Sequence, residues 1–120
     1  MNMDYSGAIA LEDVNVRSFS FSENNSHVHW LKEGANYFGN HDSNDIIYQG
    51  EGVAKHAGIL FLQKDRVLLR AAASAKVLNK RKLVDNVFIF EKNKSLILEY
   101  CSFKFRIIEE QGRYGLLIFR

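Results

Sequence analysis

Apolar and polar residues alternate with a period of two over much of the chain, which is the pattern of half-buried β-strands. The alternation runs through residues 14–21, where a change of parity near Arg17 predicts a bulge. It resumes at residues 27–30 and at residues 35–38, on either side of a turn expected at residues 32–34. Together these segments predict antiparallel strands that follow one another as a meander.

The middle of the chain predicts a hairpin. Residues 59–63 and 66–70 are apolar at successive positions and flank Lys64 and Asp65, which are suited to a tight turn. Strands with this composition are usually central or buried on both faces. We therefore expect the two segments to lie in the middle of a sheet.

Residues 70–82 leave two interpretations open. Their alanines favour a helix. The regular spacing of the flanking strands favours instead a loop, a short strand at residues 76–78, a turn at Asn79 and Lys80, and another strand from Lys82. We prefer the second interpretation.

The carboxyl-terminal third is a series of strands joined by short turns. The apolar parity is even from Leu96 to Tyr100 and odd from Phe103, so a turn or bulge is expected at Cys101. The expected strands cover residues 87–91, 95–100, 103–107 and 113–119. About ten short strands without a βαβ pattern predict an all-β fold, an antiparallel β-sandwich that forms a single domain over residues 1–120.

Composition narrows the function classes. The chain has 120 residues, of which 47% are hydrophobic and 25% charged, and this matches a globular domain. Its net charge of +2 gives no reason to expect nucleic acid as a partner. The absence of a signal-peptide pattern or of a long apolar run, together with a single cysteine, predicts a cytoplasmic protein with no membrane partner.

Residues 37–59 place two polar loops beside predicted strands, and they resemble the forkhead-associated (FHA) domain, a β-sandwich of FHA/SMAD-like architecture that reads phosphothreonine peptides. That family has Gly-Arg, a polar turn, Asp-Ile-Val-Leu and then Ser-x-x-His-Ala. Here Gly39 precedes Asp-Ile-Ile-Tyr at residues 45–48, and His56 is followed by alanine. Asn79, at the end of a predicted strand, resembles the family's asparagine.

A second resemblance covers residues 30–120. It is to the amino-terminal, FHA-like region of a bacterial family of unknown function, which has a Trp-Leu-x-x-Gly opening, an Asn-Asp-Ile turn, a His-Ala-Gly step and a Gly-Arg-Tyr-Gly ending. All four occur here in that order. This resemblance implies the fold and no particular activity.

The sequence departs from the FHA pattern where that family grips phosphate. The arginine after the glycine falls at Asn40, and the serine and the arginine of the second loop fall at Val53 and Ala54. Arginine supplies two parallel charge-assisted donors to phosphate, and these side chains do not. We therefore do not expect phosphothreonine to be read in the usual FHA manner.

The candidate ligand-binding residues lie in a predicted loop crown formed by residues 39–44, 50–56 and 79–81. Asparagine amides can both donate to and accept from a peptide backbone, and a lysine offers a point charge. The set consists of Asn40, His41, Ser43, Asn44, Lys55, His56, Asn79 and Lys80.

Other chemistry-bearing residues have plainer interpretations. His56 lacks a sequence partner that would make it a catalytic base, and the resemblance implies that it orders its loop. His27 and His29 share a strand face, but a zinc site needs further ligands. Cys101 is expected to be a small, partly buried residue. We expect no catalytic residue, no metal and no cofactor.

The favoured function is therefore a non-catalytic protein-interaction module that binds a peptide or protein segment through the loop crown. Two alternatives remain: a small-ligand-binding or hydrolytic domain with its site at the same loops, and phosphopeptide binding by substitute donors. Exposed sheet edges also allow a homodimer.

Overall fold

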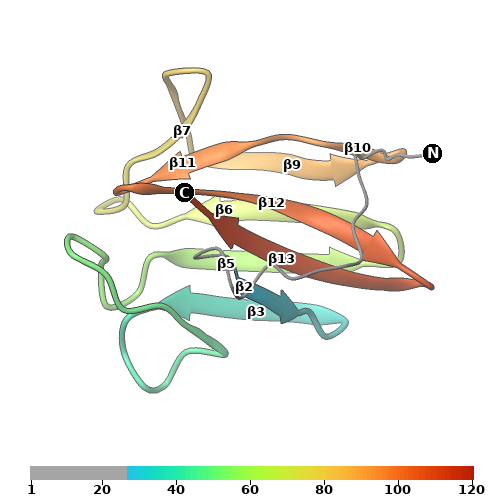
Figure 1. The fold of residues 1–120 in the computed structure, drawn as a ribbon, viewed down its shortest axis with the longest axis horizontal. Coiled ribbons are helices and arrows are strands. Elements are labelled where there is room, and N and C mark those ends of the chain that lie inside the picture. Colours follow the sequence, from blue (N-terminus) through green and yellow to red (C-terminus); the bar gives the residue numbers. More distant parts are fainter. Residues whose placement is uncertain (1–26) are drawn as a thin grey trace.

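The computed structural model describes residues 27–120, whose strands form two stacked six-stranded sheets (Figure 1). The first, here called the β5–β6 sheet, has the order β10-β9-β6-β5-β3-β4. Its strands are β3 (Gly34–Gly39), β4 (Ile46–Ile47), β5 (Gly58–Gln63), β6 (Arg66–Ala71), β9 (Asn86–Glu91) and β10 (Lys94–Ser95).

The second sheet, here called the β12–β13 sheet, has the order β2-β13-β12-β11-β7-β8. Its strands are β2 (His27–Trp30), β7 (Val77–Asn79), β8 (Lys82–Val84), β11 (Leu98–Tyr100), β12 (Phe103–Glu110) and β13 (Arg113–Phe119). The chain crosses from one sheet to the other after β2, β6, β8 and β10, so each sheet is assembled from separate parts of the sequence.

The core lies between the sheets because alternate side chains of the central strands point inward. Leu60 of β5 and Leu69 of β6 are fully buried from one side, and Phe105 and Ile107 of β12 are buried from the other. The ring centroids of Phe38 and Phe105 lie 6.2 Å apart across this interface. Burying a side chain of this size stabilises the fold by about 1.5–3 kcal/mol.

Tight turns join neighbouring strands at several hairpins. At Lys92 and Asn93, φ is +54° and +63°, and at Gln111 and Gly112 it is +54° and +82°. Paired positive φ values are those of type I′ turns, whose twist matches the twist of the strands they connect. The hairpins therefore follow from local geometry even where the turn residues are not glycine.

Most of the sequence-based fold prediction is confirmed. The described residues form an all-β sandwich of twelve strands, against about ten expected, and β5 and β6 lie in the middle of their sheet. Residues 27–120 contain no helix, so the alanine-rich region forms a turn and the short strand β7, as preferred. The strand predicted at residues 14–21 lies outside the described residues.

The meander predicted from residues 27–38 is wrong. β2 pairs with β13, and β3 pairs with β5 in the other sheet. The turn between them carries the chain across the sandwich, because the Asn36 side chain bonds both backbone groups of Lys32 and so holds the turn open. The alternation of apolar residues is the same whether two consecutive strands lie in one sheet or in two different sheets, so it could not reveal the crossing.

The strand predicted at residues 95–100 is also wrong, since it is divided between β10 and β11. The hydroxyl of Ser95 donates to the carbonyl of Ile107 (2.9 Å) and accepts from its N–H (3.1 Å). These bonds let the chain leave β9 and continue beside β12 in the other sheet. The uninterrupted apolar parity of this segment hides the crossing.

One pair of strands departs from the antiparallel arrangement. β4 runs parallel to β3, with Phe38 opposite Ile46 and Gly39 opposite Ile47. The polar loop that joins the two strands therefore emerges at the end of β3 and returns alongside it.

Within residues 27–120, no helix has the length and apolar character that crossing a membrane requires.

Candidate functional site

Two of the three predicted loops meet at one end of the sandwich, and they are called the paired loops here: residues 39–44 and residues 50–56. Backbone bonds join them directly. The Asn40 N–H donates to the Ala54 carbonyl (3.0 Å), and the His41 N–H donates to the Lys55 carbonyl (3.3 Å). The pairing was expected from the sequence, and the contacts place it immediately after β3.

Gly39 allows the two backbones to approach this closely. A Cβ built at this position would overlap the carbonyl oxygen of Lys55 and lie 2.7 Å from its carbonyl carbon, a distance that real Cβ atoms essentially never show. Any larger residue at position 39 would push the paired loops apart. Steric crowding by the Lys55 backbone therefore explains why position 39, which matches the glycine of the FHA pattern, is a glycine in this chain.

Two asparagines of the predicted site fasten the paired loops internally. The Asn40 amide donates to the Val53 carbonyl (2.9 Å). The Asn44 amide donates to the carbonyls of His41 (2.9 Å) and Lys55 (2.7 Å), and its residue is buried. Since these donors are already engaged, both side chains hold the loops in shape.

An aromatic cluster supports the second loop from inside. The Tyr100 hydroxyl accepts from the Ala54 N–H (2.8 Å), which ties the loop to β11 of the other sheet. The rings of Tyr48 and Phe103 lie 4.2 Å apart between centroids, and Tyr100 contacts the same phenylalanine at 5.7 Å. Burial raises the pKa of Tyr100, so its hydroxyl stays neutral and the contact is an ordinary hydrogen bond.

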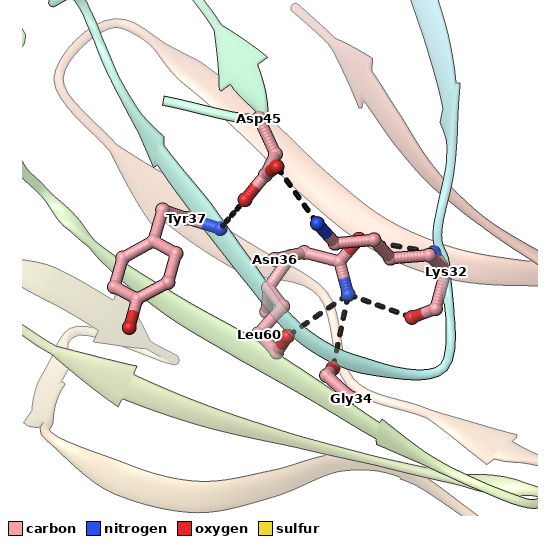
Figure 2. A network of polar contacts seen from close by, with 6 residues as sticks. All are labelled: Lys32, Gly34, Asn36, Tyr37, Asp45 and Leu60. Atoms are coloured by element: carbon pink, nitrogen blue, oxygen red, sulfur yellow. Dashed lines mark hydrogen bonds and ion pairs between the residues drawn. The ribbon is translucent and has the colours of Figure 1, made fainter. Parts of the chain in front are cut away.

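Asp45 anchors the first loop at its far end, as Figure 2 shows. One carboxylate oxygen accepts from the Tyr37 N–H (2.8 Å), and the other lies 3.0 Å from the Lys32 ammonium. The backbone bond and then the lysine hold the pKa of Asp45 below its usual value, because both favour the carboxylate. Asp45 therefore ties the end of the first loop to β3 and to the turn before it, and its carboxylate is occupied by the fold.

The same network contains Asn36, which is buried beneath the turn that leads into β3. Its amide nitrogen donates to the carbonyls of Lys32 (2.9 Å), Gly34 (3.1 Å) and Leu60 (3.2 Å), and its oxygen accepts from the Lys32 N–H (3.0 Å). Asn36 is not among the residues predicted from the sequence. A lone polar residue at an inward position of an otherwise apolar strand is the signal that could have found it.

Four predicted residues are left exposed on the paired loops: His41, Ser43, Lys55 and His56. The imidazoles of His41 and His56 face each other with 5.4 Å between centroids. Nδ1 of His41 accepts from the Ser43 N–H (3.1 Å) and lies 2.9 Å from its hydroxyl. With Nδ1 accepting from the Ser43 N–H, neutral His41 carries its proton on Nε2.

The other two predicted residues lie elsewhere. Asn79 ends β7 and its amide donates to the Ile97 carbonyl (3.2 Å), while Lys80 has φ +51° at the tip of the β7–β8 hairpin. That hairpin projects from the upper edge of the molecule, whereas residues 40–46 lie at the lower edge (Figure 1). The structure thus brings together six of the eight candidate residues.

Other candidate chemistry is sparse in the part of the chain that the structure describes. Across residues 27–120, no three His, Cys, Asp or Glu side chains gather closely enough to hold a metal ion. Burial, and to a lesser extent His27, lowers the pKa of His29. Cys101 is exposed, which corrects the expectation of partial burial, and desolvation raises the pKa of its thiol. A thiol with a raised pKa is a poor nucleophile near neutral pH.

Comparison with known proteins supports the architecture. The sequence matches no protein-family model and no curated protein. The fold is similar to an FHA domain structure from a study of phosphothreonine-dependent FHA domain interactions, with a TM-score of 0.53, 11% identity, and coverage of 79% of this chain and 95% of that chain.

A second similar structure is the amino-terminal FHA domain of Rad53p from S. cerevisiae, in complex with a phosphothreonine peptide. It has a TM-score of 0.38 and 18% identity, and it covers 71% of this chain and 66% of that chain. At that TM-score it adds nothing to the first likeness. Together with the strand order, the first shows an FHA-like fold, and the predicted resemblance is confirmed at that level.

Proposed function

We propose, from the FHA-like fold and the paired loops at one end of it, that the chain is a non-catalytic interaction module that binds a peptide or protein segment. One observation carries the proposal. The asparagines of the paired loops are engaged in holding the loops together, while His41, Lys55 and His56 remain exposed beside one another in a fixed frame. Polar side chains on rigidly held loops are suited to binding.

The chemistry of this surface favours a segment recognised by single polar contacts. Lys55 offers a point charge to a carboxylate or phosphate, without the two parallel donors of arginine. Asn40 and Val53 stand where the FHA pattern has phosphate-gripping residues. The Asn40 amide donates to the Val53 carbonyl and the Val53 side chain is buried, so neither side chain is presented to a phosphate. We therefore propose that binding does not depend on phosphothreonine. We also propose that the module acts in the cytoplasm. Cysteines stay reduced there, so the single cysteine, Cys101, needs no second cysteine to form a disulfide.

Asn79 and Lys80 fall outside this proposed site because they lie on a separate hairpin. The side chains proposed to contact a ligand are thus those of His41, Ser43, Lys55 and His56. Asn40 and Asn44 are proposed to position them.

A peptide-binding measurement tests the proposal. The probes are a library of peptides centred on phosphothreonine and the same library with unphosphorylated threonine. We expect the two libraries to bind with equal affinity, and Lys55→Ala to weaken both by about tenfold, which corresponds to about 1.4 kcal/mol.

Lys94→Ala is the matched control, since Lys94 is an exposed lysine on β10, at the other end of the sandwich from the paired loops (Figure 1). It should leave binding unchanged. Binding of the phosphorylated library alone would show that phosphate is read by substitute donors. If neither Lys55→Ala nor Lys94→Ala changed the affinity, the binding site would lie outside the paired loops.

A further inference from the structure

The outward face of the β5–β6 sheet is apolar and aromatic where a solvated sheet face is usually polar. Inward residues of its central strands are buried in the core, so their neighbours in sequence point outward. The face defined here as the aromatic face consists of Tyr37, Ile59, Phe61, Leu68, Arg70 and Phe88.

Strand register places these side chains in two adjacent rows. Phe61 lies opposite Leu68, which lies opposite Phe88, and this row is apolar across β5, β6 and β9. In the next row Ile59 lies between Tyr37 and Arg70. The face is therefore continuous over four strands.

The aromatic face is open to solvent. Tyr37 is 48% exposed and Phe88 is 36% exposed, while Phe61 and Leu68 are half-buried. Contiguous exposed apolar surface on a soluble protein usually marks a contact with another molecule. Tyrosine, phenylalanine and arginine are also enriched in interface centres.

The charges on the face indicate what that molecule is. The guanidinium carbon of Arg70 lies 5.6 Å from the Phe61 ring centroid, and that of Arg66 lies 4.7 Å from the Phe88 ring centroid. Arg66 already has Glu91 at 3.6 Å. Arg70 takes part in none of the ion pairs found among residues 27–120, which join Lys32 to Asp45, Arg66 to Glu91 and Arg113 to Glu110.

An arginine stacked on an aromatic ring keeps the N–H groups at its edge available for a carboxylate, which it can bind in a bidentate manner. A partner carboxylate beside apolar side chains would therefore complete this surface. A second copy of the same face supplies no carboxylate for Arg70, because none of the six residues that form it is acidic.

We infer that the aromatic face docks a protein segment in which Asp or Glu lies among aliphatic or aromatic residues, with the carboxylate bound to Arg70. This site is separate from the paired loops and does not depend on the function proposed for them.

Peptides of defined composition test the inference on the full chain. The probes are three sets of synthetic peptides in which aromatic or aliphatic residues alternate with Glu, with Gln or with Lys. We expect the Glu set to bind most tightly and to shift the amide NMR signals of β5, β6 and β9. Arg70→Glu should weaken that binding by about tenfold or more, because it turns an attraction into a repulsion.

Arg70→Lys should restore part of the binding, since the charge returns without the bidentate geometry. Lys104→Glu, an equal charge reversal at an exposed position of β12, is the control and should have no effect. Equal binding of the Glu and Lys sets, no binding of the Glu set, or amide shifts confined to the paired loops would each overturn the inference.

Two rival occupants would also overturn it. Light scattering that detects a dimer of the wild type, lost in Phe88→Ser but not in Leu83→Ser, would assign the face to a second copy. Tighter binding of a peptide with the sequence of residues 1–26 than of any peptide in the Glu set would assign it to the chain's own amino-terminal segment.

Discussion

Asn36 shows how one side chain can decide where a strand goes. It is 2% exposed, and its amide makes all of its hydrogen bonds with backbone groups at the turn between β2 and β3 or on β5. Those groups belong to Lys32 in the turn, to Gly34 at the start of β3 and to Leu60 on β5. The side chain therefore fastens the turn to β3 and β5 at the point where the chain enters the β5–β6 sheet.

We expect Asn36→Leu to lower the free energy of unfolding by about 2–3 kcal/mol, because several backbone groups lose their partner while the volume is nearly kept. Urea denaturation measures the change. Asn86→Leu, at an exposed position of β9, is the control and should change stability little. Equal effects of the two substitutions would contradict the role assigned to Asn36.

Asp45 gives the paired loops a pH-dependent contribution to stability. Its pKa is lowered from an ordinary value of 3.8, mainly by the Tyr37 N–H and then by Lys32. The folded state therefore favours the carboxylate, and this stabilisation is present above the ordinary value and is lost as the pH falls through the lower, folded value.

We expect the stability difference between the wild type and Asp45→Asn to be largest near neutral pH and to shrink below about pH 4. Chemical denaturation across this range measures it. Asp42→Asn, which removes the same charge from an exposed position of the same loop, serves as the control. A difference that grows as the pH falls would have the wrong sign for this mechanism.

At the scale of elements, the sequence predicted the hairpins well because each depends on residues close together. Lys64 and Asp65 between two apolar runs were enough to locate β5 and β6. Where the prediction failed, the segments that actually lie together are distant in sequence. Ser95 bonds Ile107, and β2 pairs with β13, and neither partner can be inferred from local alternation.

The candidate site divides in the same way. The paired loops were predicted because a turn at Gly39 and a returning strand at Gly58 are close in sequence. The placement of Asn79 depended on how β7 packs, which local pattern does not specify. The contribution of Tyr100 was missed for the same reason, since it reaches Ala54 from another sheet.

The turn between β9 and β10 offers a test of the hairpin geometry. Replacing Lys92 and Asn93 with Asn-Gly should raise the free energy of unfolding by about 1 kcal/mol, because both positions have positive φ and Asn-Gly suits a type I′ turn. Thermal unfolding measures the gain.

The turn at Lys64 and Asp65 provides the comparison. Only Lys64 has positive φ there (+57°), so a glycine at position 65 gains nothing and Asn-Gly should stabilise less. A larger gain at this turn than at the β9–β10 turn would show that turn geometry is not what limits stability.

At the scale of the whole molecule, the two sheets share one core. Phe105 of β12 is 2% exposed and contacts Phe38 of β3. If one sheet unfolded, the buried side chains on the inner face of the other sheet would therefore become exposed to solvent.

Phe105→Ala should lower the free energy of unfolding by about 3–5 kcal/mol, because it removes a large buried ring and leaves a cavity. The remaining protein should still unfold in one transition, with Trp30 fluorescence and far-ultraviolet circular dichroism coinciding. Leu83→Ala, at a side chain that is 66% exposed, is the control and should stay within about 0.5 kcal/mol. Separate transitions by the two probes would show that the sheets are energetically independent.

The repeated crossing of the chain between the sheets also determines what a severed molecule could do. A break at the exposed β7–β8 tip, between Lys80 and Arg81, leaves one fragment with β2–β7 and another with β8–β13, and each holds strands of both sheets. Each fragment lacks the partners of its own strands, so we expect neither to fold alone. Mixed together, they should reassemble and recover Trp30 fluorescence, which would make this chain a candidate for a split reporter.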